Sequence, residues 1–298
     1  MIGAIIGDIV GSRFEFNPTN AYDFKFFDKA CAFTDDTICT IGIADAILKG
    51  VDFCSSLHAW CQRYPHPMGA YGGRFNVWVH SSHPEPYGSF GNGSAMRVSP
   101  VAWAYSDREE MMQKAAESAS CTHNHPEGIK GAQTVALGIF KALQERVIND
   151  YKPLNKSQID LVVNKCVEHS GYNIQIEKKA VQNEFDETCQ GTVPVALWII
   201  SQSTDFEDAV RRAVSLGADA DTLGAIVGSM AEAIWGIPPE MLEMAMRYLP
   251  PEMKKVVLEF YDRYANVSQM KYYEALRKSR FVADSFTILK ADGTEDRC

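Results

Sequence analysis

Two short acidic clusters lie far apart in the 298-residue chain. The first is Thr34-Asp35-Asp36-Thr37, and the second is Asp219-Ala220-Asp221-Thr222. Each places two carboxylates and a hydroxyl at the expected start of an apolar helix, where such residues often serve only as caps and first-turn acids. The doubled pattern favours a further role. If folding joins the two clusters, their oxygens would form a hard site of the kind that Mg²⁺, Mn²⁺ and Ca²⁺ prefer.

A glycine-rich stretch is the third feature with chemical potential, Gly88-Ser89-Phe90-Gly91-Asn92-Gly93-Ser94-Ala95-Met96-Arg97. Its glycines would leave backbone amides open to an anion, and a helix is expected to begin near Ser94. It is not a P-loop, because no Gly-Lys-Ser/Thr follows, and it lacks the strand of a dinucleotide-binding fingerprint. The alternative interpretation is an ordinary glycine turn.

Two histidines precede another expected helix, in Cys121-Thr122-His123-Asn124-His125-Pro126. The His-x-His spacing could bind a transition metal, but the sequence offers no matching Cys or His pair for zinc. We therefore expect one histidine to be neutral and to donate to a ligand oxygen, or to cap the helix.

Glu15 lies between two phenylalanines, Phe14 and Phe16. A partly buried carboxylate there would need a cation or a hydrogen-bond partner. The alternative is a surface glutamate paired with Arg13 or Lys25.

Helical periodicity runs through nearly the whole chain and predicts the elements that position these residues. Gly3, Gly7 and Gly11 in the first helix, and Gly224 and Gly228 after the second acidic cluster, are spaced by four residues and predict close helix contacts in a soluble core. Alternation typical of strands is scarce. The sequence predicts an all-α fold, a compact orthogonal multi-helix bundle, with helices over residues 37–49, 107–120, 126–146, 157–168, 193–202, 205–216, 222–235, 239–247 and 251–264.

Composition and charge restrict the class of protein. The chain is 46% hydrophobic and 22% charged, which is typical of a soluble globular protein. A net charge of −9 argues against general affinity for nucleic acid or anionic membranes. Eight cysteines without a C-x-x-C pair, together with an apolar but acid-containing first segment that makes a poor signal peptide, favour a reduced, cytoplasmic location. We predict a single domain over residues 1–280 and a polar tail over 281–298.

Taken together, the motifs resemble those of the ADP-ribosylglycohydrolase family, which includes dinitrogenase reductase-activating glycohydrolase and the eukaryotic ADP-ribosyl hydrolases. The resemblance covers most of residues 1–236, and several motifs in the same order make it specific. They are Gly7-Asp8, residues 11–15, residues 34–37, residues 88–97, Thr122-His123 with His125-Pro126, residues 191–198 and residues 217–222.

The resemblance implies an all-α enzyme that holds two Mg²⁺ or Mn²⁺ ions in a central cleft and releases ADP-ribose from a modified protein or small conjugate. It implies no membrane, and nucleic acid only where that is ADP-ribosylated. The implied metal ligands are Thr34, Asp35, Asp36, Asp219, Asp221 and Thr222. Glu15, Asp35 or Asp36 would act as acid or base. The implied substrate contacts are Ser89, Phe90, Gly91, Asn92, Gly93 and His123, with His125 as the other possible histidine.

The glycine loop resembles the serine-type branch of the family most closely, but this does not define the acceptor, which could be serine, arginine, O-acetyl-ADP-ribose or a nucleic-acid end. Two other functions are compatible with the motifs. One is a non-catalytic ADP-ribose-binding or crystallin-like relative. The other is an all-α prenyl-diphosphate enzyme, which Cys39 disfavours because it stands where a further aspartate is expected, four residues after Asp35.

Overall fold

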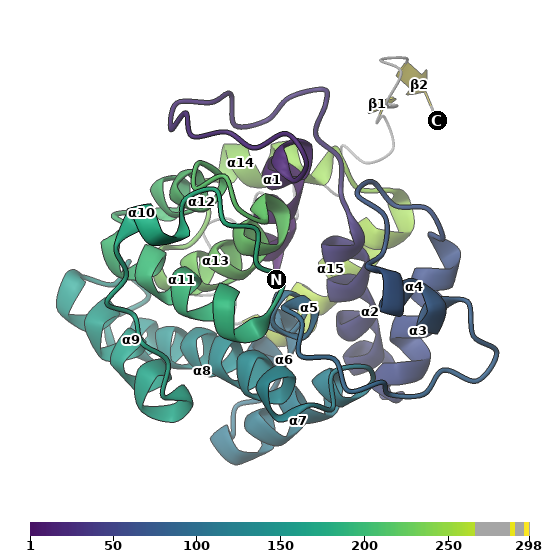
Figure 1. Ribbon diagram of the computed structural model, residues 1–298, viewed down its shortest axis with the longest axis horizontal. Helices are drawn as coiled ribbons and strands as arrows, with labels where there is room; N and C mark the ends of the chain where they lie inside the picture. Colours follow the sequence, from purple (N-terminus) through teal and green to yellow (C-terminus); the bar gives the residue numbers. More distant parts are fainter. Residues whose placement is uncertain (266–286, 290–294, 298) are drawn as a thin grey trace.

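The structure is a computed structural model, and it describes residues 1–265, 287–289 and 295–297 (Figure 1). Polar capping residues and apolar periodicity divide the chain into helices. Thr34, Asp52, Asp107 and Asp205 each begin a helix by accepting a backbone N–H two or three residues ahead. The helices, in chain order, are α1 (Ile2–Gly11), the 3₁₀ turn η1 (Ser12–Phe14), α2 (Asp35–Lys49), α3 (Phe53–Arg63), α4 (Gly73–Val79), α5 (Gly93–Met96), α6 (Ser99–Ala104), α7 (Arg108–Ser120), α8 (Pro126–Ile148), α9 (Lys156–Ser170), α10 (Lys178–Val181), α11 (Cys189–Gln202), α12 (Phe206–Val214), α13 (Ala220–Trp235), α14 (Pro239–Met246) and α15 (Pro251–Tyr264).

The all-α prediction is confirmed, and the helices predicted from periodicity are present. The start of α11 differs from the prediction, which began that helix at residue 193 because proline favours a first turn. The helix instead begins at Cys189, where the Thr188 side chain caps it by accepting from the Gly191 N–H, and Pro194 lies inside it. The helices α3, α4, α6 and α10 were not among those predicted from periodicity. The last three are too short to show a period.

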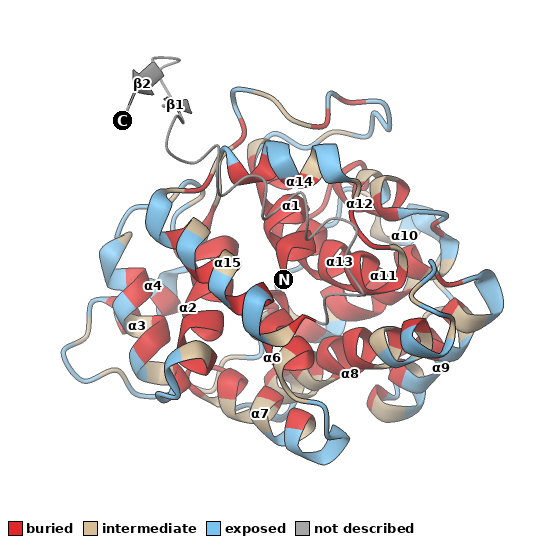
Figure 2. Cartoon of the chain, turned by 180° about the vertical axis from the view of Figure 1, so that it is seen from behind, coloured by how far each residue is buried: buried red, intermediate tan, exposed pale blue. Residues whose placement is uncertain are grey.

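The helices α1 and α13 pack against each other near the centre of the molecule, and glycines lie at their contact (Figure 1). A methyl group added to Gly7 would lie 1.9 Å from the carbonyl oxygen of Gly224, and one added to Gly3 would lie 2.1 Å from that of Gly228. The two backbones therefore touch with no room for side chains, which confirms the predicted close packing. All of α1 is buried, as Figure 2 shows. This contact brings the start of α13 beside the end of α1.

The remaining helices pack around this pair. The long helix α8 contacts α7, α9, α11 and α13, while α2 contacts α3, α6 and α15. In Figure 1 the helices α8, α9, α11 and α12 lie on one side of α1 and α13, and α2, α3 and α4 lie on the other. The starts of α2 and α13 carry the two acidic clusters and are joined by a hydrogen bond between Thr222 and Asp36.

The C-terminal end adds a small antiparallel pair of strands, β1 (Thr287–Leu289) and β2 (Glu295–Arg297), with Ile288 opposite Asp296. This pair of strands was not predicted from the sequence. The predicted boundary between residues 280 and 281 lies outside the described residues. Where the structure describes the chain, no helix has the length and apolarity needed to cross a membrane. The cysteines within that part carry free thiols.

Candidate active site

Asp8 attaches the first acidic cluster to the central helix α1. It is fully buried and accepts hydrogen bonds from the backbone N–H groups of Thr34 and Thr37, both at 3.0 Å, and from the Thr34 hydroxyl at 2.7 Å. The Thr37 hydroxyl also donates to it. A carboxylate that accepts four hydrogen bonds holds the first turn of α2 in one place. Sequence analysis gave Asp8 no role in the site, although a lone acid in an apolar helix was a signal that could have identified it.

The two acidic clusters meet at the start of α2 and α13. The Thr222 hydroxyl donates to Asp36 Oδ2 at 3.1 Å, although the two residues are 186 positions apart in the sequence. Glu15, which follows η1, lines the same pocket as Asp219 and Asp221. The structure therefore brings Glu15 and the aspartates of both clusters into one place.

The glycine loop lies against these acids and is tied to the chain just before α11. Asn92 donates from its side chain to Asp219 Oδ2 at 2.7 Å and to Thr192 Oγ1 at 3.1 Å. Its backbone N–H donates to the Glu187 carbonyl at 2.6 Å, and the Gly91 N–H donates to Ser89 Oγ at 3.2 Å. The expectation of open amides is therefore wrong for Gly91 and Asn92, because the loop uses them to hold its own shape. Asn92 orients Asp219.

The two candidate histidines have different environments. His123 is buried, with 4% of its surface exposed, and lies against Gly91 and Gly93. His125 is exposed and caps α8, since its Nδ1 accepts from the Glu127 N–H at 3.1 Å. Phe90 is 42% exposed, and its ring lies 5.3 Å from that of His125. Of the two histidines, only His123 faces the acidic site.

A pocket of about 260 Å³ joins these features. Of the predicted site residues, Thr34 and Phe90 do not line it, because Thr34 is turned toward Asp8 and Phe90 lies outside. Its wall also contains residues that sequence analysis had not assigned to the site, among them Arg74, Tyr87, Arg97, Phe185 and Glu187. The predicted residues that do line the pocket are Glu15, Asp35, Asp36, Ser89, Gly91, Asn92, Gly93, His123, Asp219, Asp221 and Thr222.

The segment between α3 and α4 closes one side of this pocket. Met68 forms an isolated parallel bridge with Thr34, and the Tyr71 hydroxyl donates to the Tyr64 carbonyl at 2.8 Å. Gly69 has a φ of +81°, and a methyl group there would lie 2.4 Å from Glu15 Oε2. Glycine at this position thus allows the backbone to pass directly beside the Glu15 carboxylate.

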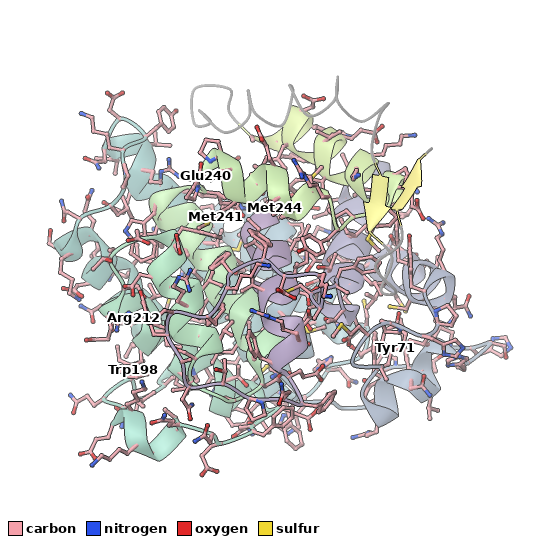
Figure 3. The ribbon with its side chains drawn as sticks, turned by 90° about the horizontal axis from the view of Figure 1, so that it is seen from above. Tyr71, Trp198, Arg212, Glu240, Met241 and Met244 are labelled. Atoms are coloured by element: carbon pink, nitrogen blue, oxygen red, sulfur yellow. The ribbon has the colours of Figure 1, made fainter. Side chains whose placement is uncertain are left out.

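A larger depression, of about 930 Å³, lies between α9, α11 and residues 172–177. Trp198 is one of its lining residues, and Figure 3 shows Trp198 on the opposite side of the view from Tyr71, the neighbour of pocket residues Ala70 and Gly72. We place the active site in the smaller pocket because the carboxylates, the glycine loop and His123 converge there.

Burial of so many carboxylates in one place shifts their protonation. Burial, followed by the negative charge of Asp8, raises the pKa of Asp35 and of Asp36 well above the ordinary value of 3.8. Burial and the charge of Asp219 raise the pKa of Asp221 well above that value and raise the pKa of Glu15 to about 7. Burial also raises the pKa of Asp8 to about 6. Burial is the largest cause for all of these groups, and no ammonium or guanidinium among the described residues forms an ion pair with them that would offset it.

The chemistry of this donor set fits divalent cations. All the candidate ligands are hard oxygen donors, and the buried Asp36 Oδ1 has no hydrogen-bond partner. Excess buried negative charge is a further reason to expect a cation, since unpaired buried carboxylates are costly. In their present rotamers, however, no three Asp, Glu, His or Cys side chains of the described residues enclose a point that could hold a metal ion. Binding of an ion by three of these side chains would therefore require a change of rotamer.

The chain is similar in sequence to known proteins of one family. A sequence model of the family described as ADP-ribosylglycohydrolase matches residues 1–274. The chain is similar to the ADP-ribosylarginine hydrolase Tri1 of Pseudomonas putida (strain GB-1), at 24% identity over 306 residues that cover 91% of this chain and 79% of Tri1. It is also similar to the ADP-ribosylhydrolase ARH3 of Homo sapiens, at 25% identity over 306 residues that cover 80% of this chain and 84% of ARH3.

A solved structure described as an ADP-ribosylglycohydrolase-related protein complex shares the fold. Its TM-score to this chain is 0.64 at 23% sequence identity, and the match covers 88% of this chain and 95% of that one.

Proposed function

Because this chain belongs to the ADP-ribosylglycohydrolase family, we propose that its acidic pocket hydrolyses the bond at the anomeric ribose carbon of ADP-ribosylated substrates in a reaction that depends on Mg²⁺ or Mn²⁺. The observation that supports this most strongly is the convergence of Asp36, Thr222, Asp219 and Glu15 on one pocket with the glycine loop. A ribose ring offers hydroxyls to such a site, and its diphosphate offers negative charge to the opposite wall.

The pocket is lined by groups of opposite charge. Asp36 and the other carboxylates gather near Thr222, whereas Arg74 and Arg97 lie with the neutral His123 around Tyr87 and Thr122. No ion pair joins a pocket carboxylate to either arginine within the described residues. An ADP-ribosyl group has a neutral ribose next to an anionic diphosphate, and this order of charges matches the pocket. The acidic side would repel the diphosphate, so the polarity of the pocket also orients the substrate.

The residues of this chain then have distinct tasks in the proposed reaction. Asp35, Asp36, Asp219, Asp221 and Thr222 would hold the two ions, with Asn92 orienting Asp219 and Asp8 holding the first turn of α2. Thr34 would contribute through Asp8 or by turning toward the pocket. When bound, the ions would orient the ribose hydroxyls and make a water molecule more acidic.

Glu15 is the best-placed residue for proton transfer in this proposal. Its Oε2 has no hydrogen-bond partner among the described residues, and Glu15 lines the pocket beside the backbone of Gly69. Water adds to the anomeric carbon while the bond to the acceptor breaks, through a transition state with oxocarbenium character. The water loses one proton, and the departing acceptor atom gains one. Glu15 would carry out one of these two proton transfers.

Among the possible acceptors, the mouth of the pocket favours arginine. Phe16 and Phe185 are exposed and stack with ring centroids 6.3 Å apart, and Glu187 lines the pocket next to them. Aromatic faces and carboxylates both attract a guanidinium group. The similar protein Tri1 is named an ADP-ribosylarginine hydrolase.

The test is a hydrolysis screen on arginine-, serine- and nucleic-acid-linked ADP-ribose and on O-acetyl-ADP-ribose. Each substrate is assayed with EDTA, and then with Mg²⁺ or Mn²⁺ restored. We expect release of ADP-ribose only with metal, and fastest from arginine. Turnover that is unchanged in EDTA would refute metal dependence. Tight binding of ADP-ribose in calorimetry, without hydrolysis of any substrate, would instead establish the non-catalytic binding function. The prenyl-diphosphate alternative is set aside because of the family to which the chain belongs.

A further inference from the structure

Arg97 is a buried cation in the wall of the pocket. It is 1% exposed, and no carboxylate among the described residues forms an ion pair with it. Its Nη2 donates to Thr122 Oγ1 at 2.8 Å and to the Ser118 carbonyl at 3.3 Å, while its Nε has no partner. Burying a guanidinium without a counter-charge lowers the stability of the folded protein. We therefore looked for a functional role for Arg97.

The hydrogen bond from Arg97 to Thr122 restricts how the Thr122 hydroxyl can bond to His123. A guanidinium can only donate, so the Thr122 oxygen accepts from Arg97. The Thr122 hydroxyl lies 2.6 Å from His123 Nδ1, and no other acceptor for its proton is found among the described residues. The Thr122 hydroxyl proton therefore has an acceptor only if Thr122 donates it to His123 Nδ1. A neutral imidazole whose Nδ1 accepts must carry its proton on Nε2.

His123 Nε2 faces the glycine loop. A methyl group added to Gly91 or to Gly93 would lie 3.5 Å or 3.4 Å from this nitrogen, and both glycines line the pocket. Nε2 has no hydrogen-bond partner among the described residues, so its N–H is available to a bound molecule. The missing side chains at Gly91 and Gly93 leave space for that molecule.

We infer that Arg97 and Thr122 are positioning residues that hold His123 as the neutral Nε2–H tautomer, so that it donates a hydrogen bond to an anionic oxygen at the glycine loop. The identity of that oxygen as part of the ADP-ribose diphosphate rests on the proposed function, whereas the tautomer does not. Burial, with a smaller effect of the Arg97 charge, also lowers the pKa of His123 well below 6.5, which agrees with a neutral ring.

The alternative is that Arg97 only joins the end of α5 to the end of α7 through the carbonyl groups of Ser118 and Ala119. In that case loss of Arg97 would change stability alone. Because Arg97 variants can fail to fold, the decisive pair is Thr122→Val and Thr122→Ser. Valine keeps the shape and removes the hydroxyl, and serine restores the hydroxyl. Thr134→Val is the matched control, since Thr134 is also buried and donates to a carbonyl, that of Lys130, outside the pocket.

The first measurement uses the full-length protein labelled with ¹⁵N-histidine, without ligand. Long-range ¹H–¹⁵N spectra identify the protonated ring nitrogen, and His123→Gln assigns the signal. We expect the Nε2–H pattern in the wild type, in Thr122→Ser and in Thr134→Val. In Thr122→Val we expect a mixture with the Nδ1–H tautomer. A wild-type His123 that is protonated at Nδ1, or a Thr122→Val variant with the wild-type pattern, would overturn the inference.

The second measurement is calorimetric affinity for ADP-ribose in Mg²⁺. We expect roughly tenfold weaker binding for Thr122→Val, the loss of about one charge-assisted hydrogen bond, and recovery in Thr122→Ser. A tautomer change without any loss of affinity would overturn the donor role. Absence of ADP-ribose binding to the wild type would count against the proposed function, and the spectra would still decide the tautomer.

Discussion

The hydroxyl of Thr222 donates a hydrogen bond of 3.1 Å to the carboxylate of Asp36. This single contact joins the first turn of α13 to the first turn of α2, and both side chains are buried. Asp36 also keeps one oxygen, Oδ1, without a partner. The free oxygen and the neighbouring hydroxyl make this pair the clearest point at which to test the proposed metal site.

Asp36→Asn should reduce Mn²⁺ affinity by at least about tenfold and abolish metal-dependent release of ADP-ribose, because loss of a direct ligand costs no less than loss of an outer-shell partner. Calorimetric titration with Mn²⁺ and the hydrolysis assay measure these effects. Asp45→Asn is the matched control, since Asp45 is also a buried acid of α2, but it accepts from Trp60 at 2.8 Å outside the pocket. Wild-type Mn²⁺ affinity in Asp36→Asn would remove Asp36 from the site.

Asp8→Ala should destabilise the protein by about 1–3 kcal/mol, because it leaves the buried donors of Thr34 and Thr37 without their acceptor. It should also weaken Mn²⁺ binding, since the first turn of α2 would no longer be held against α1. Urea denaturation and calorimetry test the two effects. Asp52→Ala, which removes the exposed cap of α3, should lower stability alone. Equal Mn²⁺ affinity in Asp8→Ala and Asp52→Ala would mean that Asp8 is only structural.

Gly7→Ala should lower the free energy of unfolding by roughly 3 kcal/mol or more, because overpacking a core destabilises a protein even where side chains can move. Here the added methyl group would meet backbone, 1.9 Å from the Gly224 carbonyl oxygen. Gly73→Ala is the control, since a methyl group there meets nothing within 4 Å. Chemical denaturation compares the two variants. A Gly7→Ala protein as stable as Gly73→Ala would show that α1 and α13 can separate at little cost.

Removal of the Glu15 charge should change how stability depends on pH in the metal-free protein. Its folded pKa is raised to about 7 from an ordinary value of 4.5, so the folded state binds the proton more tightly than the unfolded state does. Ionisation of Glu15 therefore lowers the free energy of unfolding as the pH rises from 4.5 to about 7. Relative to the wild type, Glu15→Gln should become progressively more stable over that range.

Denaturation in EDTA at several pH values measures this difference. The comparison with Glu15→Gln cancels the titrating groups that Glu15 does not influence, including His123, whose lowered pKa acts in the opposite direction. The pKa values of Asp35 and Asp221 also respond to the Glu15 charge, so their contribution is part of the measured difference. A stability difference that does not vary with pH would show that Glu15 is not protonated more readily in the folded state. Added Mn²⁺ should reduce the pH dependence, because the ion replaces the proton among the carboxylates.

Local patterns of the sequence accounted for the helices and for most candidate residues of the site. An apolar period and a capping residue act within a few positions of one another, so α2 and α13 could be predicted, as could the acids at their starts. The spacing of Gly3, Gly7, Gly224 and Gly228 likewise predicted the close contact. His123 and the glycine loop were singled out because their residue types carry their own chemistry.

Only the tertiary structure decided which of these residues act together. Asp8 holds Thr34, Asn92 holds Asp219, and Arg97 reaches His123 through Thr122. Apart from the step between Thr122 and His123, these contacts join segments between 25 and 127 positions apart. They depend on how whole helices pack, which no local spacing encodes. Phe90 and Thr34 show the same limit in reverse. The family resemblance placed them in the site, but Thr34 is turned toward Asp8 and neither residue lines the pocket.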